Sequence, residues 1–272
     1  MTMNAKEREE FATLFAHVED LALRAEQGSL TYSAFLTPRE LHYAEVHLRH
    51  INAPYRSFGG YAEAERCWLY LLPSYMEELA ETEKADFDDL LDAFGYHTDV
   101  AVLQIMGSGY RALGHRDFLG SVLALGLERS VLGDLLTDGE EARRAVLFCD
   151  AAIAPFVQNE LKKVANDKVT VMPLTKGEWN LPPRRFAPIG DTVASARLDG
   201  VVAALCGLSR ERAREAVSAG LVEMNFESED RPDRAVSAPC LISVRGFGRY
   251  RVVSLDERTK KGRLRLLAER YL

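Results

Sequence analysis

A segment rich in proline and glycine, KGEWNLPPRRFAPIGD at residues 176–191, interrupts the periodic pattern of apolar residues along the chain. Proline breaks helices and strand ladders, and glycine favours turns, so such a segment marks a connection between folded parts. The 272 residues are also enough for about two domains. We therefore predict a first domain of residues 1–180, a linker of residues 181–190 and a second domain of residues 191–272.

The first domain is predicted to be an α+β fold with a helical lead-in. Apolar residues at three- and four-residue steps predict a helix over 7–27. Thr37, Pro38 and Glu40 form the pattern of a capping box that opens a second helix. The patterns that follow predict strands at 66–73, 100–106, 131–136, 143–148 and 168–174, and helices at 87–94, 118–127 and 154–165. This order indicates a ferredoxin-like or RRM-like α/β plait with an extra helix.

Charge is spread unevenly between the two predicted domains. Residues 191–272 hold 15 lysines and arginines against 12 acidic residues, whereas the rest of the chain holds 19 against 29. This asymmetry is typical of a nucleic-acid-binding module on an acidic carrier, although acidic helices can also serve only for solubility.

Several classes of protein are not supported by the sequence. There is no apolar run of about 18 residues, so no membrane span and no membrane partner are predicted. The charged N-terminus lacks the apolar core of a secretory signal, and a cytoplasmic protein is expected. The four cysteines form no CxxC pair and the six histidines no H-x-x-x-H pair, so neither a metal nor a cofactor is predicted.

The second domain opens with two short predicted helices followed by strands. Ser209 is suited to cap the second helix and Gly220 to end it. Its motifs resemble the S-four domain, a small αL-type RNA-binding module. The matching residues are Arg197-Leu198-Asp199, Leu208-Ser209-Arg210, Ala213, Gly220, Val222 and Asn225. Two features depart from that pattern: Pro239-Cys240 precedes the next strand, and the loop ESEDRPDR is acidic.

The residues of this module suit phosphate binding. Arg210 and Arg214 lie four apart, so they share one helix face. Ser209 marks the positive end of that helix, where a phosphate can bind, and Arg197 could border the same surface. Arginine binds phosphates through two hydrogen bonds and stacks on bases, which fits RNA.

The chain ends in a basic, glycine-containing stretch, ISVRGFGRYRVVSLDERTKKGRLRLL. Alternation predicts that Arg245, Arg249 and Arg251 share one face of a sheet. Further charge comes from Lys260, Lys261, Arg263 and Arg265. The alternative is an edge strand that uses basic residues to prevent aggregation.

Motifs beyond the module resemble the YlmH-type family in the same order: FLTPRE, FGGYAEAER, GHRDFLGSVLALGLERSVLGDLL, VQNEL and ISVRGFGRYRV with TKKGRLRL. The resemblance implies a non-catalytic protein that binds rRNA of the large ribosomal subunit and peptidyl-tRNA in quality control of stalled translation. It also implies support of a factor that adds alanine tails. The residues predicted to contact RNA are Arg197, Ser209, Arg210, Arg214, Arg245, Arg249, Lys260, Lys261 and Arg263.

Other interpretations stay open from the sequence. In the first domain, Arg56, Arg66, His115 and Arg116 are candidates for a second RNA contact. The segment Arg197-Leu198-Asp199 also resembles the Arg-Leu-Asp motif of pseudouridine synthases, so an RNA-modifying enzyme is one alternative. The residues around the segment differ from those around that motif. An adaptor for translation or cell division is another, because the first domain is acidic enough to bind protein rather than RNA.

Overall fold

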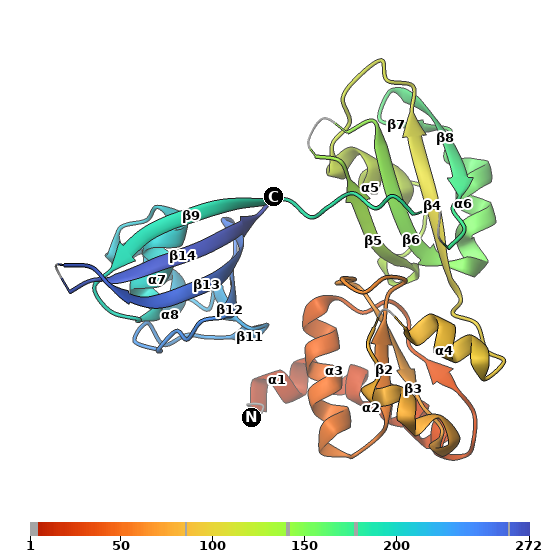
Figure 1. Ribbon diagram of the computed structural model, residues 1–272, viewed down its shortest axis with the longest axis horizontal. Helices are drawn as coiled ribbons and strands as arrows, with labels where there is room; N and C mark the ends of the chain where they lie inside the picture. The colour runs from red at the N-terminus through yellow and green to blue at the C-terminus, as the bar shows by residue number, and fades with distance from the viewer. Residues whose placement is uncertain (1–4, 85, 140–141, 177–178, 261) are drawn as a thin grey trace. The chain divides into compact units, whose positions relative to one another are not determined.

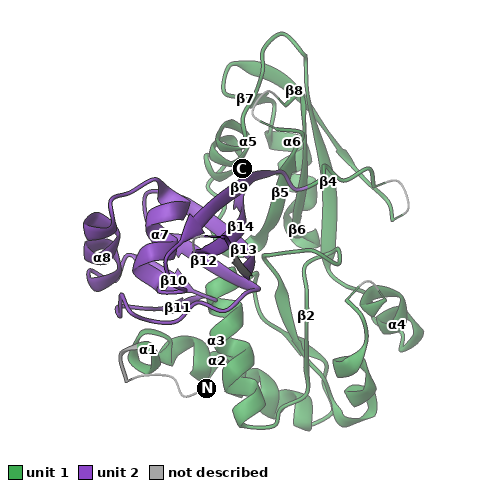
Figure 2. Ribbon diagram, turned by 60° about the vertical axis from the view of Figure 1, so that its left-hand side comes forward, with its two compact units in different colours: residues 1–183 green, residues 184–272 purple. Residues whose placement is uncertain are grey.

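The computed structural model describes residues 5–84, 86–139, 142–176, 179–260 and 262–272 (Figure 1). The chain divides into two compact units, Met1–Pro183 and Arg184–Leu272 (Figure 2). Each unit has its own sheets and apolar core and is described by itself. None of the described helices is long and apolar enough to cross a membrane.

The first unit begins with helices packed on a small antiparallel sheet of order β1-β3-β2. The helices are α1 (Ala5–Glu10), α2 (Ala12–Glu26) and α3 (Pro38–His50), and the strands are β1 (Thr31–Tyr32), β2 (Tyr55–Phe58) and β3 (Trp68–Leu71). The capping box of α3 is confirmed: the Thr37 hydroxyl accepts the Glu40 N–H, and the Glu40 carboxylate accepts the Thr37 N–H at 2.7 Å. The lead-in is therefore helical only in part, because a sheet completes it.

Strand β3 is buried on both faces. Leu69 and Leu71 belong to the apolar cluster with α2 and α3. Trp68 and Tyr70 belong to a second cluster that includes Met76 of the 3₁₀ helix η1 (Ser74–Glu81) and residues of α4 (Phe87–Ala93). The sequence prediction placed this strand in the same plait as those that follow. That assignment is wrong, because among the described strands β3 pairs with β1 and β2 and not with the strands that follow.

The rest of the first unit is a five-stranded antiparallel sheet of order β5-β6-β4-β8-β7. Its elements are β4 (Val100–Gly107), α5 (His115–Leu123), η2 (Arg129–Val131), β5 (Leu132–Thr137), β6 (Arg144–Asp150), η3 (Ala151–Ile153), α6 (Ala154–Glu160), β7 (Lys163–Val164) and β8 (Asp167–Pro173). Phe118 and Val122 of α5 and Val157 of α6 are buried in its core. The helix predicted over 154–165 ends earlier, at Glu160, because β7 forms a short hairpin with β8.

The second unit is a six-stranded antiparallel sheet of order β11-β10-β12-β13-β14-β9 with two helices. They are β9 (Phe186–Val193), α7 (Leu198–Cys206), α8 (Arg210–Ser218), β10 (Val222–Met224), β11 (Glu227–Ser228), β12 (Cys240–Val244), β13 (Gly248–Arg258) and β14 (Leu264–Tyr271). The predicted linker is wrong in its second half, because β9 starts at Phe186 and pairs along its length with β14. A proline near a sheet edge is tolerated, so Pro188 does not prevent this pairing.

The motif residues of this unit have structural reasons to be there. Ala213 and Val222 are fully buried in the core between helices and sheet. Asn225 has a φ of 52°, in the left-handed region, at the turn between β10 and β11. Its side-chain oxygen accepts the Leu241 N–H at 2.9 Å, which ties the turn to β12.

Candidate RNA-binding site

A buried carboxylate organises two of the predicted arginines. Asp199 lies in the first turn of α7, and its side chain is 3% exposed. Its Oδ2 accepts the Arg197 Nη2 at 3.0 Å and its Oδ1 accepts the Arg197 Nε at 3.3 Å. Arg210, at the start of α8, reaches the same Oδ1 through its Nη2 at 3.5 Å. Asp199 therefore holds both guanidinium groups at the N-terminal ends of the two helices, while the side chains of Arg197 and Arg210 remain 41% and 60% exposed.

The electrostatics of Asp199 agree with this role. Burial alone would raise the pKa of its carboxyl, but the hydrogen bond from Arg197 and the charges of Arg210 and Arg197 outweigh burial and lower the pKa. The folded state therefore prefers the ionised form. Its stabilising contribution is complete above the ordinary aspartate pKa of about 3.9 and is lost as the pH falls through the lower folded pKa.

We expect Asp199→Asn to lower the free energy of unfolding at pH about 7 by about 1–3 kcal/mol, since a charged acceptor is replaced by a neutral one. The difference from the wild type should shrink as the pH falls below the ordinary aspartate range. Urea unfolding at a series of pH values measures this. A difference that stays constant down to the lowest pH would contradict the role of the carboxylate charge.

A hollow with a volume of about 430 Å³ lies beside Asp199 and Arg210, between α7, the start of α8 and the end of β9. Arg210 and Arg263 both line it. Arg263 is held in place by Thr192, because its Nε donates to the threonine hydroxyl at 3.0 Å and its Nη2 to the threonine carbonyl at 2.6 Å. Two arginines far apart in sequence thus face one hollow of a size that fits a nucleotide.

Other predicted residues lie near the same surface. Ser209 caps α8, since its hydroxyl accepts the Arg212 N–H at 3.3 Å. Arg214 is exposed one turn further along α8. Lys260 is exposed in the turn that leads to Arg263. Lys261 lies outside the described residues.

Arg245 and Arg249 do not join this group. Arg245 lies in the turn after β12, not on a strand, so the prediction that it shares a sheet face with Arg249 and Arg251 is wrong. Arg249 alternates with the buried Tyr250 and so lies on the sheet face opposite the helices. Its guanidinium is 5.9 Å from the Phe226 ring centroid and 5.7 Å from that of Tyr271. The predicted contacts therefore divide between two faces of the second unit.

Arg66 lies in a buried site that does not suit an RNA contact. It is 7% exposed, and its guanidinium donates to three backbone carbonyls: Leu132 at 2.8 Å, Phe35 at 3.1 Å and Arg129 at 2.8 Å. Its own N–H is accepted by Asp134 at 3.0 Å. Burial, and then the charge of Arg129, lower the pKa of Arg66. The side chain links the segment before α3 to η2 and to the start of β5, and its burial does not suit a phosphate contact.

The remaining candidates of the first unit lie on two elements, β2 and α5. Arg56 is half-buried on β2, and its Nε is buried without a hydrogen-bond partner among the described residues. His115 and Arg116 open α5 at the surface. Desolvation, and then the charge of Arg129, lower the pKa of His115, so the ring is neutral near pH 7 and adds no positive charge. Only Arg116 keeps the properties of an exposed phosphate contact.

A basic end of the five-stranded sheet was missed by sequence reasoning. Tyr110 is 94% exposed in the loop after β4. The loop is held by the Gly107 N–H to the Arg143 carbonyl at 2.8 Å and by the Ser108 N–H to the Lys168 carbonyl at 3.1 Å. Exposed basic residues gather there: Arg111, Arg143, Lys162, Lys163 and Lys168. An aromatic side chain among cations suits a base and its phosphates.

The basic residues of this end are separated along the chain, and the pairing of β7 with β8 brings the lysines to the Tyr110 loop. The sequence alone therefore does not show that they form one group. Lys163 and Lys168 are directly opposite each other in the hairpin. Like charges at such positions destabilise a sheet, and an anion between them removes that cost. The GSGYR loop could be identified as a loop from sequence, but only the hairpin brings the lysines to it.

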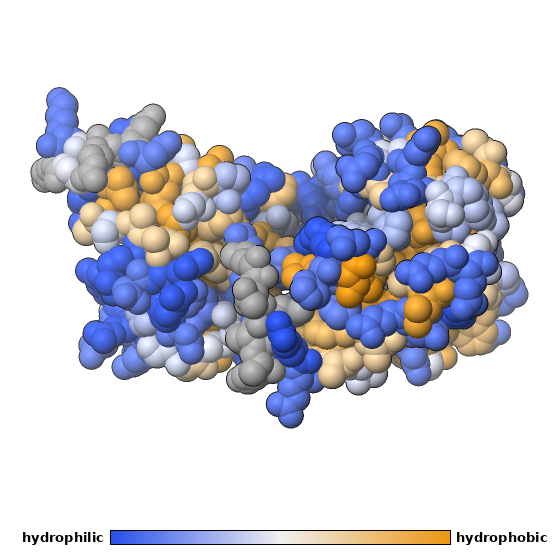
Figure 3. Space-filling view, turned by 90° about the horizontal axis from the view of Figure 1, so that it is seen from below, coloured by the Kyte–Doolittle hydropathy of each residue, from blue (hydrophilic) through white to orange (hydrophobic). Residues whose placement is uncertain are grey.

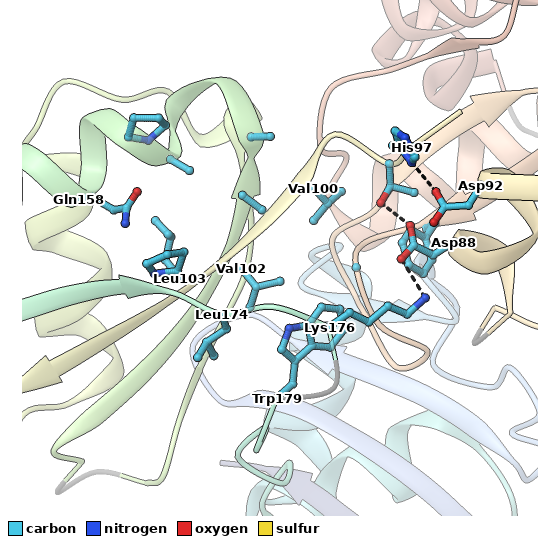
Figure 4. Close-up of a pocket in the computed structure, with 18 residues that line it drawn as sticks. Asp88, Asp92, His97, Val100, Val102, Leu103, Gln158, Leu174, Lys176 and Trp179 are labelled. Carbon is cyan, nitrogen blue, oxygen red and sulfur yellow. Dashed lines mark hydrogen bonds and ion pairs between the residues drawn. The ribbon is translucent and has the colours of Figure 1, made fainter. Parts of the chain in front are cut away.

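A second hollow of about 450 Å³ lies in the first unit between the five-stranded sheet and α4 (Figure 4). Val100, Val102 and Leu174 form its apolar wall, with Trp179 beside them. On the α4 side, the Lys176 Nζ is 3.0 Å from the Asp88 carboxylate and also pairs with Asp89. His97 Nδ1 lies 2.6 Å from Asp92. The ion pairs of Lys176 and the contact of His97 with Asp92 engage these charged groups with one another, and Lys176 links α4 to the segment after β8. Within the described part of the chain, no group of three or more histidine, cysteine and acidic side chains is arranged to hold a metal ion.

Comparison with known proteins shows similarity at two levels. The family model described as "Putative RNA-binding domain in YlmH" matches residues 97–178, which contain the five-stranded sheet. The ribosome-associated protein quality control protein P2 of Bacillus subtilis (strain 168) is 29% identical over 245 residues, which are 90% of this chain and 89% of that protein.

A solved structure of the cell division protein ylmH from Streptococcus pneumoniae has a TM-score of 0.48 and 18% identity. The match covers 64% of this chain and 95% of that chain. The resemblance to the YlmH-type family that the sequence motifs indicated is confirmed by the family model and by the similarity to the Bacillus subtilis protein.

Proposed function

We propose that the chain binds RNA without bond chemistry and acts in quality control of stalled translation. Its proposed targets are rRNA of the large ribosomal subunit and peptidyl-tRNA, and its proposed effect is to support the factor that adds alanine tails. The observation that carries this proposal is the arrangement around Asp199, which holds Arg197 and Arg210 beside a hollow that Arg263 also lines. Arginines fixed in advance by a buried carboxylate lose little conformational freedom when they bind phosphate.

The fold supports two finer parts of the proposal. We infer that the second unit is an S-four domain, since α7, α8 and the β10–β11 turn hold the motif residues in defined positions. We also infer that the five-stranded sheet is a ferredoxin-like plait. The elements β4, α5, β5, β6, α6 and β8 follow the strand–helix–strand–strand–helix–strand series, and their strands are antiparallel in the order β5-β6-β4-β8.

The proposed absence of catalysis rests on the state of the reactive groups. Both oxygens of Asp199 accept hydrogen bonds from arginines, which suits a positioning role rather than nucleophilic attack. Burial raises the pKa of the Cys149 thiol to about 12 and that of Cys240 to about 11, so both are protonated and unreactive at neutral pH. A cytoplasmic location is part of the same proposal.

The test is sedimentation of the purified chain with isolated large subunits, with and without peptidyl-tRNA, over a salt series. We expect binding at low salt that weakens steeply as salt rises, because each phosphate contact releases counterions. We also expect tighter binding to subunits that carry peptidyl-tRNA. Failure to sediment with either kind of subunit at low salt would rule out the ribosomal part of the proposal.

A further inference from the structure

The first unit carries a group of exposed aromatic side chains around η1 and α4. Tyr75 is 51% exposed, Phe94 41% and Tyr96 37%. The ring centroids of Tyr75 and Phe94 are 6.5 Å apart, and the hydroxyls of Tyr75 and Tyr96 are 3.0 Å apart. Leu90 is exposed on α4 as well. Figure 3 shows one face of the molecule, on which hydrophobic residues are exposed among hydrophilic ones. We call residues 74–99 the acidic aromatic lobe.

The acidic aromatic lobe also concentrates the charge of the chain. Its 26 residues contain nine acidic residues and a single lysine, a net charge of −8, while the whole chain carries −7. Glu77, Glu78, Glu81, Glu83 and Asp86 are exposed. None of these five has an ion-pair partner among the described residues, although Asp88, Asp89 and Asp92 do have partners. Negative charge thus surrounds the exposed rings.

The lobe is fixed in shape before any partner arrives. Met76 and Leu79 of η1, and Phe87 and Leu91 of α4, are buried in one apolar cluster. Lys176 ties α4 to the segment after β8 through Asp88 and Asp89. The exposed aromatic rings are therefore not side chains of a loosely held helix. A preformed surface loses less entropy when it binds.

We propose that the acidic aromatic lobe docks a basic protein segment, rich in lysine and arginine and carrying apolar side chains. The charge disfavours RNA, since phosphates would face the five exposed carboxylates of Glu77, Glu78, Glu81, Glu83 and Asp86. Cations of the partner would pair with the carboxylates and lie over the rings, and its apolar side chains would cover Phe94 and Leu90. Exposed aromatic residues are typical of protein interfaces, and the surrounding charge decides the sign of the partner.

Fluorescence anisotropy with the full chain tests this proposal. The probe is a labelled peptide in which lysine and arginine alternate with leucine and tryptophan, and a second peptide has serine in place of leucine and tryptophan. We expect the first peptide to bind and the second to bind about tenfold more weakly, because it lacks apolar area to bury. Tyr75→Ser/Phe94→Ser/Tyr96→Ser should weaken binding of the first peptide by about tenfold for the same reason.

A charge variant separates the lobe from the acidic chain as a whole. Glu77→Gln/Glu78→Gln/Glu81→Gln should weaken peptide binding by about tenfold and reduce its salt dependence. The matched control, Glu9→Gln/Glu26→Gln/Glu160→Gln, removes equal charge from other exposed sites of the first unit and should bind as the wild type does.

The proposal would be overturned by equal binding of both peptides, by wild-type binding of the aromatic variant, by equal weakening in the control, or by binding of oligouridine RNA that depends on the lobe. Self-association that disappears in the aromatic variant would also overturn it and would assign the surface to a second copy. Because the RNA-binding arginines of the second unit are untouched, sedimentation with large subunits reports separately on the proposed function.

Discussion

The Arg210→Ala/Arg263→Ala variant is expected to bind large ribosomal subunits on the order of 100-fold more weakly than the wild type, because each charge-assisted hydrogen bond to a phosphate contributes about 1.5 kcal/mol. These two arginines face the same hollow from α8 and from the turn before β14. The fold should survive, because Arg210 is exposed and Asp199 keeps its hydrogen bonds to Arg197.

The salt dependence gives an independent reading of the same variant. The slope of log affinity against log salt should fall by about one for each phosphate that is no longer neutralised, hence by about two. Sedimentation or filter binding over a range of salt concentrations measures both the affinity and the slope. The slope distinguishes weaker phosphate binding from a general loss of folded protein, which would lower the active fraction and leave the slope unchanged.

The matched control is Arg212→Ala/Arg231→Ala, which removes two exposed arginines from the same unit without touching the hollow. It should lose only a small part of the affinity through the long-range field. Equal losses of affinity in the two double variants would show that the second unit attracts RNA by net charge alone and that the hollow has no special role.

A second large effect is expected for Arg66→Ala, which should lower the free energy of unfolding by about 3–5 kcal/mol. The substitution leaves the carbonyls of Phe35, Arg129 and Leu132 without their donor in a buried site. It also opens a cavity where the side chain was. Urea unfolding followed by circular dichroism measures the decrease.

The comparison variant is Arg116→Ala, which removes an exposed arginine from the same unit and should change stability by no more than about 0.5 kcal/mol. At a temperature where Arg66→Ala remains folded, its RNA affinity should equal that of the wild type. A folded Arg66→Ala protein with weakened RNA binding would show that this residue does contact RNA.

Local pattern was enough to predict most helices and strands. The capping residues Thr37 and Glu40 mark the start of α3 because their hydrogen bonds are formed within four residues. Ser209 marks α8 for the same reason. The pair Arg210 and Arg214 could likewise be placed on one helix face, since helix geometry fixes positions four residues apart.

Long-range pairing was beyond the sequence in several places. β3 has the pattern of an apolar strand, but its pairing with β1 and β2 instead of the plait depends on partners ten or more residues away. β9 lies in a segment whose prolines predict a linker, and only its pairing with β14 makes it a strand. Lys163 and Lys168 join the Tyr110 loop through a hairpin that begins where a helix was predicted to continue.

The sequence by itself determined the starts of α3, α6 and α8, the strand-rich ending and the motif residues that resemble the YlmH-type proteins, because these depend on neighbours along the chain. The helix predicted over 118–127 instead begins at His115, and the helix predicted over 7–27 is divided into α1 and α2. Only the tertiary structure decided what each arginine does. Arg66 is a buried donor to three carbonyls, and Arg249 lies on the sheet face opposite the helices. Arg210 and Arg263 line the same hollow. An arginine has the same charge everywhere in a sequence, and its role follows from which acceptors and how much water the fold leaves around it.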